Sequence, residues 1–595
     1  MPSPPRHSPR VATTAPMNGA INGGREAREV EWQLTAPDLG VVRRWLDQHP
    51  RLDHLSIRPL PARQIHDTYL DTEDWRLFRA GFALRVRDQA GHLEATLKEL
   101  HSAREDVADR REITEGLSQA GVKALAQATG PVGRRVRDVA GVKPLRPLFE
   151  VRTSRQRFAV RNGKPDAAIG EIALDEARFS RRGRYRRPMV LTRVELEAVG
   201  HDSVPLEQLA DRLRTECGLS RATENKFAVG LRSASLVPPR GAGPDREPGL
   251  APAVMDTSTR ATDFAATALR RLHQEWQANE PSARLGEGPE PLHRLRVTAR
   301  RMDTILSLFR AHLPAGVRNS RQILKDLLEA LGLVRDADIR LEAASSFRSS
   351  LPEGERGRFD AVLQYLRSER VRARSIMLRA LDAKRARDWL DTLPDQLAKT
   401  PPATSSASSR NAAALTVVPD LIRKRYRKLR KFARRLTAES SMTEFHEVRV
   451  RAKKLRYALE VIAPTYAKPA SRMLAALHKL QSRLGMQHDA EVIARYLTQL
   501  AGRPPADFPA ATLFMMGRMA EQRSREATRM GRRVAGPWRR VRGKRWEALR
   551  SRMEKRRDEV APSTGKGTVV NYGTHGNGRL GSAPARWTSA QVVLH

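Results

Sequence analysis

The chain shows two different patterns of hydrophobic and polar positions. Between Glu29 and about Val237, apolar and polar residues alternate in short runs such as DTYLDT, FALRVRD, HLEATLKEL and TRVELEAV, which Gly, Pro and Asp interrupt. Alternation with a period of two predicts β-strands, with a few helices between them. From about residue 258, apolar residues recur every three or four positions in stretches rich in Ala, Leu and Arg, which predicts helices.

Segments without either periodicity suggest the domain boundaries. The run LVPPRGAGPDREPGLAP is rich in Pro and Gly, which is typical of a linker, and TPPATSSASSR is typical of a loop between two helical halves. Both ends of the chain are rich in Gly, Ser, Pro and Thr, which predicts disorder. The predicted organisation is a disordered N-terminus (1–26), a strand-rich domain (27–235), a linker (236–257), a helical domain (258–550) in two halves (about 258–399 and 411–550), and a tail (551–595) that is basic and then disordered.

The helical half contains an internal duplication. HRLRVTARR begins at His293 and HEVRVRAKKLRY begins at His446, while LGLVRDAD and LGMQHDAE contain Gly332 and Gly485. Each Gly follows its His by 39 positions (332 − 293 and 485 − 446), and the copies are 153 residues apart (446 − 293). Because unrelated segments rarely share both text and spacing, we expect two similar helical bundles packed as one all-α domain.

Composition adds a strong constraint on partners. The 595 residues include 108 Lys and Arg against 67 Asp and Glu, a formal net charge of +41. Such a charge indicates a polyanionic partner, which could be nucleic acid, an acidic membrane surface or inorganic phosphate; an Arg-rich surface without a partner is the alternative. The single cysteine, Cys217, excludes an internal disulfide and a Cys-based metal site. The N-terminus has no apolar signal region and no stretch is apolar enough for a membrane span, so we expect a cytoplasmic protein.

Several predicted strands carry charged residues on one face. Residues two apart share a face of a strand, and seven such rows are present: Glu29, Glu31 and Gln33; Arg85 and Arg87; Glu94, Thr96 and Lys98; Arg110 and Glu112; Arg155 and Arg157; Glu171 and Asp175; Glu195 and Glu197. A solvated sheet surface is the ordinary interpretation of one row, but seven rows with apolar residues between them favour a barrel with a polar lumen. Arg and Lys can bind phosphate oxygens, and carboxylates can reach phosphate through Mg²⁺ or Mn²⁺.

These strands resemble the CYTH family, the triphosphate tunnel metalloenzymes. Glu29-Val30-Glu31-Trp32-Gln33 resembles the family's ExExK signature, and TYLDT, LRVR, TLK, RRE, EIALD, VELE and NKF follow in the family's order. The resemblance covers about 27–235. It implies an α+β domain built on an eight-stranded antiparallel β-tunnel, which acts as an inorganic triphosphatase with Mg²⁺ or Mn²⁺.

The resemblance also implies roles for single residues. Metal ligands would be Glu29, Glu31, Glu195 and Glu197; phosphate-binding residues would be Arg85, Arg87, Lys98, Arg110, Arg155, Arg157 and Lys226; and Glu112, Glu171 and Asp175 would assist the metals or the attacking water. Two positions depart from the pattern, since Gln33 replaces the signature Lys and Asn225 replaces the Ser before the late Lys. An amide cannot supply a positive charge, so a catalytically weak polyphosphate-binding protein is the alternative.

Basic stripes mark the duplicated helices. Offsets of 0, 3 and 7 residues fall on one helix face, which aligns His293, Arg296 and Arg300 in one copy and His446, Arg449 and Lys453 in the other. Each His could be a capping or packing residue or a phosphate contact. The stripes are flanked by Arg301, Lys454 and Arg456, and a further ridge contains Arg423, Arg427, Arg430 and Arg434. The repeated HxxRVxxRR and LGxxRDxD text resembles the CHAD domain, which implies a pseudo-twofold helical domain that binds inorganic polyphosphate through these cations.

Two other functions stay open. The basic segment 521–559 contains Trp538 and Trp546, and interleaved aromatic residues can stack on nucleic-acid bases. Adenylate cyclase activity on ATP is a further alternative within the same tunnel family. The leading prediction is a metal-dependent triphosphatase whose helical domain binds inorganic polyphosphate. We expect it in the cytoplasm, and association with polyphosphate granules is left open.

Overall fold

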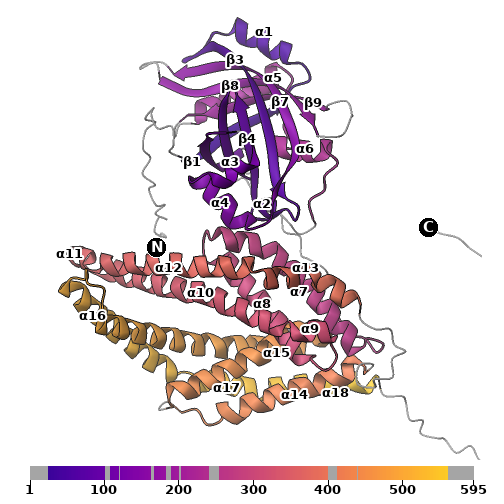
Figure 1. Cartoon of the computed structure of the whole chain (residues 1–595), viewed down its shortest axis with the longest axis vertical. Helices are drawn as coiled ribbons and strands as arrows, with labels where there is room; N and C mark the ends of the chain where they lie inside the picture. Colours follow the sequence, from indigo (N-terminus) through magenta and orange to yellow (C-terminus); the bar gives the residue numbers. More distant parts are fainter. Residues whose placement is uncertain are drawn as a thin grey trace, which may run out of the picture.

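The structure is a computed structural model that describes residues 24–100, 108–119, 121–162, 167–181, 189–199, 203–239, 253–399, 412–437 and 440–560. It places a strand-rich domain against one side of a helical domain (Figure 1). These residues leave out most of four predicted segments: the disordered N-terminus, the linker, the loop at 400–410 and the tail. At the edges of those segments, the first strand begins at Arg25 and the last helix ends at Asp558.

The strand-rich domain is a closed antiparallel barrel, which confirms the predicted eight-stranded tunnel. The barrel strands follow the order β1-β6-β5-β4-β3-β7-β8-β9, and pairing between β9 and β1 closes the ring. Two short strands, β2 and β10, pair with β3 and β1. The bounds are β1 (Arg25–Thr35), β2 (Arg51–Leu52), β3 (Leu55–Thr72), β4 (Phe82–Gln89), β5 (His92–Glu99), β6 (Ala108–Leu117), β7 (Leu145–Asn162), β8 (Ala167–Ser180), β9 (Met189–Ala198) and β10 (Ser220–Arg221).

The outer face of the barrel is apolar and covered by helices. Trp32 and Leu34 of β1 are buried in one core cluster with residues of α1 and α5, and α3 and α4 contribute to another over β4, β5 and β6. A third cluster lies on the inner side of the barrel, where Phe227 of α6 packs with Tyr69 and Phe149, and Tyr69 and Phe227 line the lumen. Because alternate side chains of a strand point to opposite faces, the apolar outer face leaves the charged rows inside the barrel. The helices are α1 (Leu39–Gln48), α2 (Arg76–Arg79), α3 (Val122–Gln127), α4 (Pro131–Ala140), α5 (Val204–Glu216) and α6 (Lys226–Ser233).

The C-terminal domain is all-α, as predicted. Most of its helices share one large apolar core, and a smaller cluster lies where α10, α12, α15 and α16 meet. In the part of the chain that the structure describes, none of the helices is long and apolar enough to cross a membrane. The elements are α7 (Ala261–Leu285), α8 (Glu290–Leu308), α9 (Ala315–Asn319), α10 (Arg321–Ser350), α11 (Glu353–Arg356), the short 3₁₀ helix η1 (Gly357–Phe359), α12 (Asp360–Asp382), α13 (Lys384–Ala398), α14 (Ala414–Ala433), α15 (Met442–Gly502), α16 (Ala510–Gly531), α17 (Ala535–Arg542) and α18 (Lys544–Asp558).

The duplication appears as pseudo-twofold symmetry. Helices α7 and α14 begin 153 residues apart, at Ala261 and Ala414. Ahead of them, Arg260 and Ala413 form an antiparallel bridge, in which Ala261 N donates to Ala412 O (2.9 Å) and Ala414 N to Thr259 O (2.8 Å). Because each bond is the other shifted by 153 residues, the copies meet through one self-complementary contact.

A helix break occurs at corresponding places in the two copies. Helix α15 contains a kink at Ala467, where φ is 46° and ψ is −130°. Subtracting 153 gives Pro314, which lies between α8 and α10. The two halves of α15 therefore correspond to α8 and α10, and both copies carry their basic stripe on the first half.

The two domains share a polar interface. Helices α2 and α4 of the barrel domain lie against α7 (Figure 1). Ion pairs cross the boundary, including Lys143 with Asp391 (2.9 Å) and Arg374 with Asp138 (2.9 Å). Glu287, which precedes α8, pairs with Arg111 of β6. The same strand presents lumen residues beside Arg111, so the tunnel wall contacts the helical domain directly.

Candidate functional site

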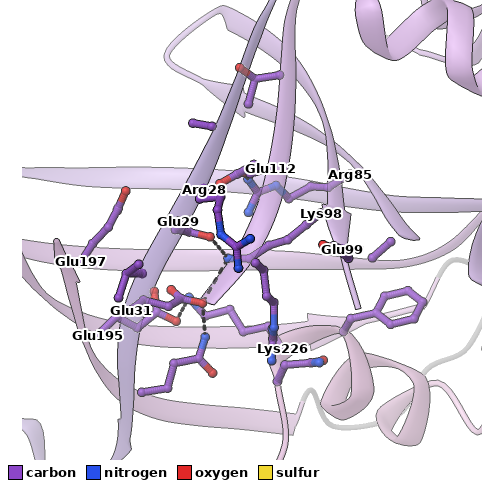
Figure 2. A pocket seen from close by; sticks show the side chains of 18 of the residues that line it. Arg28, Glu29, Glu31, Arg85, Lys98, Glu99, Glu112, Glu195, Glu197 and Lys226 are labelled. Carbon is purple, nitrogen blue, oxygen red and sulfur yellow. Dashed lines mark hydrogen bonds and ion pairs between the residues drawn. The ribbon is translucent and has the colours of Figure 1, made fainter. Parts of the chain in front are cut away.

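The barrel lumen holds a charged cavity of about 560 Å³. Its wall combines acidic and basic side chains from many strands, which point toward one another (Figure 2). Of the residues predicted from the sequence, the cavity is lined by Glu29, Glu31, Arg85, Arg87, Lys98, Arg110, Glu112, Arg155, Glu171, Glu195, Glu197 and Lys226. Arg157 and Asp175 do not line it. The structure thus brings twelve of the fourteen predicted tunnel residues to one cavity, and their roles stay predictions.

Strand register brings carboxylates together. Glu31 of β1 lies opposite Glu197 of β9, which lies opposite Glu171 of β8. Like charges directly opposite each other destabilise a sheet unless cations compensate them. Burial, followed by the nearby Glu29 and Glu31, raises the pKa of Glu197 to about 7. This side of the lumen therefore has an excess of negative charge.

Lys98 compensates part of that charge. Its Nζ pairs with Glu29 and, at 3.1 Å, with Glu31 Oε1 (Figure 2). Burial lowers the pKa of Lys98, but Glu31 and Glu29 outweigh it and raise that pKa above its ordinary value. Burial and the neighbouring Glu29 and Glu195 raise the pKa of Glu31 despite Lys98. One ammonium group is thus shared by two carboxylates.

A second cluster surrounds Glu195. Its carboxylate pairs with Lys226 Nζ at 3.0 Å and with Arg155 Nη2 at 2.7 Å. Burial alone would raise the pKa of Glu195, yet Lys226 and Arg155 hold it well below its usual range. Asp175 is fully buried and pairs with the same two cations, at 2.5 Å to Lys226 and 2.7 Å to Arg155. Since Asp175 is outside the cavity, it orients Arg155 and Lys226 and is not placed to meet a substrate.

Two further ion pairs occupy the lumen. Arg85 Nη2 lies 3.1 Å from Glu112 Oε1, and Arg157 pairs with Glu171. Arg110 differs, because its buried Nε has no hydrogen-bond partner and the group forms no ion pair among the described residues. Its guanidinium group is therefore available to an anion in the cavity.

Sequence reasoning missed Asp67 and Arg193. Asp67 accepts two hydrogen bonds from Arg87, at 2.8 and 2.9 Å, and lies 4.0 Å from Arg85. Burial opposes its ionisation, but Arg85 and Arg87 lower its pKa below the ordinary value. Asp67 shares a strand face with Tyr69 and Arg193 shares one with Glu195, so the period of two was the signal that could have found both.

The two departures from the family pattern have structural counterparts. Asn225 caps α6 by accepting a hydrogen bond from Ala228 N at 2.9 Å. Asn and Ser are both favoured caps, so this change preserves the position of Lys226 at the start of α6. Gln33 lines the cavity and donates a hydrogen bond from Nε2 to Glu31 Oε1 at 2.6 Å.

The carboxylate set has the chemistry of a site for a hard divalent cation. Glu29, Glu31, Glu195 and Glu197 offer oxygen ligands, which Mg²⁺ and Mn²⁺ prefer. Lys98, Lys226 and Arg155 occupy three of them, and no group of three potential ligands is already arranged for a metal ion among the described residues. Glu197 lies opposite Glu31 and Glu171 in the sheet register and forms no ion pair among the described residues. The residues therefore fit such a cation.

The stripes of the helical domain converge where its two copies meet. Burial, followed by Arg449 and then by Arg300 and Arg296 of α8, lowers the pKa of Lys453 of α15 to about 7. Asp489 is the acid that opposes it most. The two stripes thus form one centre with an excess of positive charge, which we call the stripe centre: Arg296, Arg300, Arg449 and Lys453. Its acids are Asp489, which lies 3.8 Å from Arg449, and Asp336.

The two stripe histidines lie at the rim of this centre. His293 and His446 are exposed, so neither is a core residue. Burial and then neighbouring arginines lower the pKa of both below 6.5. His488, which replaces Arg335 in the second copy, lies 5.2 Å from His446 between ring centroids, and its pKa falls to about 4 because of burial and Arg449.

The other predicted polyphosphate-binding residues divide into two groups. Arg301 and Arg456 pair with Glu460, at 2.9 and 3.4 Å, and Arg423 pairs with Glu554 at 2.5 Å. These three cations are paired with carboxylates, and their role in polyphosphate binding stays a prediction. The remaining four of these predicted residues are exposed and form no ion pair among the described residues: Arg427, Arg430, Arg434 and Lys454.

The tryptophans of the basic segment are part of the core. Trp538 is 6% exposed and Trp546 is 9% exposed. Trp546 stacks on Tyr426 of α14, with ring centroids 3.6 Å apart. Neither indole is available to stack on a base, so this sequence feature gives no support to nucleic-acid binding.

The fold and the site define a two-domain protein in which a barrel with a charged lumen precedes a duplicated helical domain. The model of the CYTH domain matches residues 42–230, and that of the CHAD domain matches residues 267–498. The chain therefore carries a CYTH domain followed by a CHAD domain. The CYTH family includes triphosphatases and cyclases, and CYTH domains are generally metal-dependent.

Solved structures that are similar to parts of the chain include the following three. The CHAD domain from the plant Ricinus communis is 23% identical and covers 51% of this chain and 97% of its own, with a TM-score of 0.39. PptA from Streptomyces chartreusis is 21% identical, with coverage of 47% and 100% and a TM-score of 0.38. HpAC1 from Hippeastrum, described as having a dominant triphosphatase activity, is 21% identical, with coverage of 35% and 98% and a TM-score of 0.27.

Proposed function

We propose that the barrel hydrolyses inorganic triphosphate with the help of Mg²⁺ or Mn²⁺. The observation that carries this proposal is the cavity of about 560 Å³ in which cations and carboxylates alternate. Ligand sites of about 300–1,000 Å³ are typical for small molecules. A purely basic cavity would only hold phosphate, whereas the added carboxylates provide for a cation and for proton transfer.

The ion pairs inside the lumen occupy cations that would bind the substrate. Lys98, Arg155 and Lys226 are held by carboxylates in the free protein, and phosphate oxygens of triphosphate replace those carboxylates as their partners. Arg110, which forms no ion pair among the described residues, binds phosphate directly. Glu29, Glu31, Glu195 and Glu197 then hold the divalent cation, which neutralises phosphate charge when it is bound.

Glu112 is the favoured base for the attacking water. It lines the cavity and is held by Arg85 at 3.1 Å, so its position is fixed before substrate arrives. Water forms the new P–O bond as the P–O bond to the leaving pyrophosphate breaks, and the carboxylate accepts the water proton. Glu171 also lines the cavity and is the second candidate for this role.

We propose that the CHAD domain binds inorganic polyphosphate at the stripe centre. Burial is the largest cause of the lowered pKa of Lys453, and Arg449, Arg300 and Arg296 add to it against Asp489, so positive charge is in excess at this centre. A chain of closely spaced phosphates would neutralise this positive charge. Arg427, Arg430 and Arg434 of α14 extend the basic surface for longer chains.

Phosphate release tests the proposed hydrolysis. Full-length protein with Mn²⁺ or Mg²⁺ should release phosphate from tripolyphosphate, and Glu195→Gln or Arg85→Ala should reduce the rate by at least about a hundredfold, since each removes a charge that acts on phosphate or metal. Arg178→Gln, an exposed change on β8, is the matched control and should keep the wild-type rate. Full activity of either lumen variant would show that the reaction occurs elsewhere.

A further inference from the structure

Arg193 is a buried cation that the reaction described above does not use. It lies on β9 two residues before Glu195 and is only 2% exposed. Its Nη1 donates to Gln33 Oε1 at 3.1 Å, and its Nη2 donates to Glu224 O at 2.7 Å. Among the described residues its hydrogen-bond partners are these neutral oxygens, whereas buried charges are ordinarily held by an opposite charge.

Gln33 connects Arg193 to the carboxylate side of the cavity. Its Oε1 accepts from the guanidinium group while its Nε2 donates to Glu31 Oε1 at 2.6 Å. An arginine only donates and a carboxylate only accepts, so these two partners determine the orientation of the amide. The order from β9 to β1 is therefore cation, amide, carboxylate.

A lysine at position 33 would not fit this arrangement. An ammonium group has donors but no acceptor, so it would leave Arg193 Nη1 without a partner. It would also place two positive charges within about 3 Å, a contact that is strongly repulsive in a buried site. Glutamine is the residue type that can accept from one neighbour and donate to the other.

Arg193 also holds the segment that carries Lys226. Glu224 O, its second acceptor, is two residues before Lys226 and one before the α6 cap Asn225. One guanidinium group thus contacts both the β1 side and the α6 side of the cavity.

We propose that Arg193 is a positioning residue which, through Gln33, orients Glu31 for metal binding and thereby replaces the signature lysine of the family. Gln33 and Arg193 form a matched pair, and Gln33 is not a sign of a degraded site. This inference rests on the proposed metal-assisted hydrolysis, but it concerns how the carboxylates are held, so metal binding can test it without turnover.

A double-mutant cycle on the full-length protein provides the test. The variants are Gln33→Lys, Arg193→Met and the combination, with Arg178→Gln as the exposed control on the adjacent strand β8. Mn²⁺ binding is measured by electron paramagnetic resonance, and tripolyphosphate binding and phosphate release follow on the same proteins. Each single change should weaken Mn²⁺ binding by about tenfold, which is within the range of coupling between contacting residues. The combined variant, in which the introduced ammonium group meets no second cation, should bind within about threefold of wild type.

The direction of the Arg193→Met effect separates positioning from simple charge. Removal of a positive charge alone would tighten Mn²⁺ binding, so weaker binding identifies loss of the Gln33 and Glu31 orientation. A combined loss equal to the product of the single losses, about a hundredfold, would overturn the proposal. So would Gln33→Lys protein that binds Mn²⁺ as tightly as wild type or more tightly.

Two further outcomes are also informative. If circular dichroism shows that Arg193→Met does not fold, Arg193→Lys replaces it, and partial retention of Mn²⁺ affinity is expected because one of the two hydrogen bonds can form; wild-type affinity would overturn the proposal. If wild-type protein releases no phosphate but the cycle in Mn²⁺ binding shows coupling, the proposed hydrolysis fails and the positioning role of Arg193 stands.

Discussion

Lys453 should take up a proton when polyphosphate binds. In the free protein its ammonium group is partly buried and faces Arg449, Arg300 and Arg296, with Asp489 opposing them. These surroundings lower its pKa from 10.5 to about 7. Bound phosphates bring negative charge next to the same group and reverse the electrostatic part of that change.

The size of the effect follows from the pKa. At pH 8 a group with a pKa near 7 is roughly 90% neutral, so a full shift on binding takes up about 0.9 proton. Binding then weakens by up to about tenfold per pH unit above pH 7, and this group contributes little pH dependence below pH 7. The sign is fixed, because the complex holds more protons than the free protein between pH 7 and the raised pKa.

Calorimetry on the full-length protein measures the uptake. Long-chain polyphosphate is titrated at pH 8 in buffers with different ionisation enthalpies, and the change in apparent enthalpy gives the number of protons. Lys453→Arg copies the residue found at the equivalent position, Arg300, and should lower the uptake by most of one proton while it preserves binding. Lys479→Arg changes an exposed lysine of the same helix and is the control.

Equal proton uptake by wild type and Lys453→Arg would refute this reasoning. Histidines near the stripe centre also have lowered pKa values, so they add to the uptake of both proteins: His293, His446 and His488. The difference between the two proteins therefore isolates Lys453. Loss of binding in Lys453→Arg would instead show that this position needs the smaller ammonium group.

Two further predictions concern stability. Asp71 accepts hydrogen bonds from Leu77 N and Phe78 N, both at 2.9 Å. Because Asp71→Ala leaves these buried donors unpaired, it should lower the free energy of unfolding of the barrel domain by about 2 kcal/mol in denaturant titrations. An unfolding midpoint equal to that of the exposed control Glu73→Ala would contradict this. Trp546→Ala should cost about 3–5 kcal/mol of stability because a buried stacked indole is lost, and RNA binding by the folded protein should not change; a specific loss of RNA affinity at unchanged stability would restore the nucleic-acid hypothesis.

The lumen was predictable because the period of a strand is two. Alternation from Glu29 to Gln33, and likewise in the other rows, identified which residues share a face, and the apolar residues between them identified the covered face. Pairing register is not readable from one strand, because it depends on the neighbouring strand and its turns. For that reason the row of Glu31, Glu197 and Glu171 and the contact between Arg193 and Gln33 appear only in the structure.

In the helical domain, too, the sequence predicted which residues share a face but not what that face contacts. Helical periodicity placed Arg296 and Arg300 on one stripe, and the duplication predicted its copy. A helix face does not reveal what it meets, so the pairing of Arg301 and Arg456 with Glu460 was outside the reach of sequence reasoning. The nucleic-acid alternative depended on Trp546 within a basic segment, whereas in the structure Trp546 is buried against Tyr426.

The two basic regions differ in what they need in order to bind phosphate. In the tunnel, Lys98, Arg155 and Lys226 already have carboxylate partners, so phosphate that binds alone would leave Glu29, Glu31 and Glu195 without their cations. Each lost compensation of a buried carboxylate is costly, and a divalent cation removes that cost. The stripe centre has few acids to release, and polyphosphate can bind there without a metal. Triphosphate in the tunnel should therefore bind cooperatively with metal, while the helical domain should retain polyphosphate even when metal is removed by a chelator.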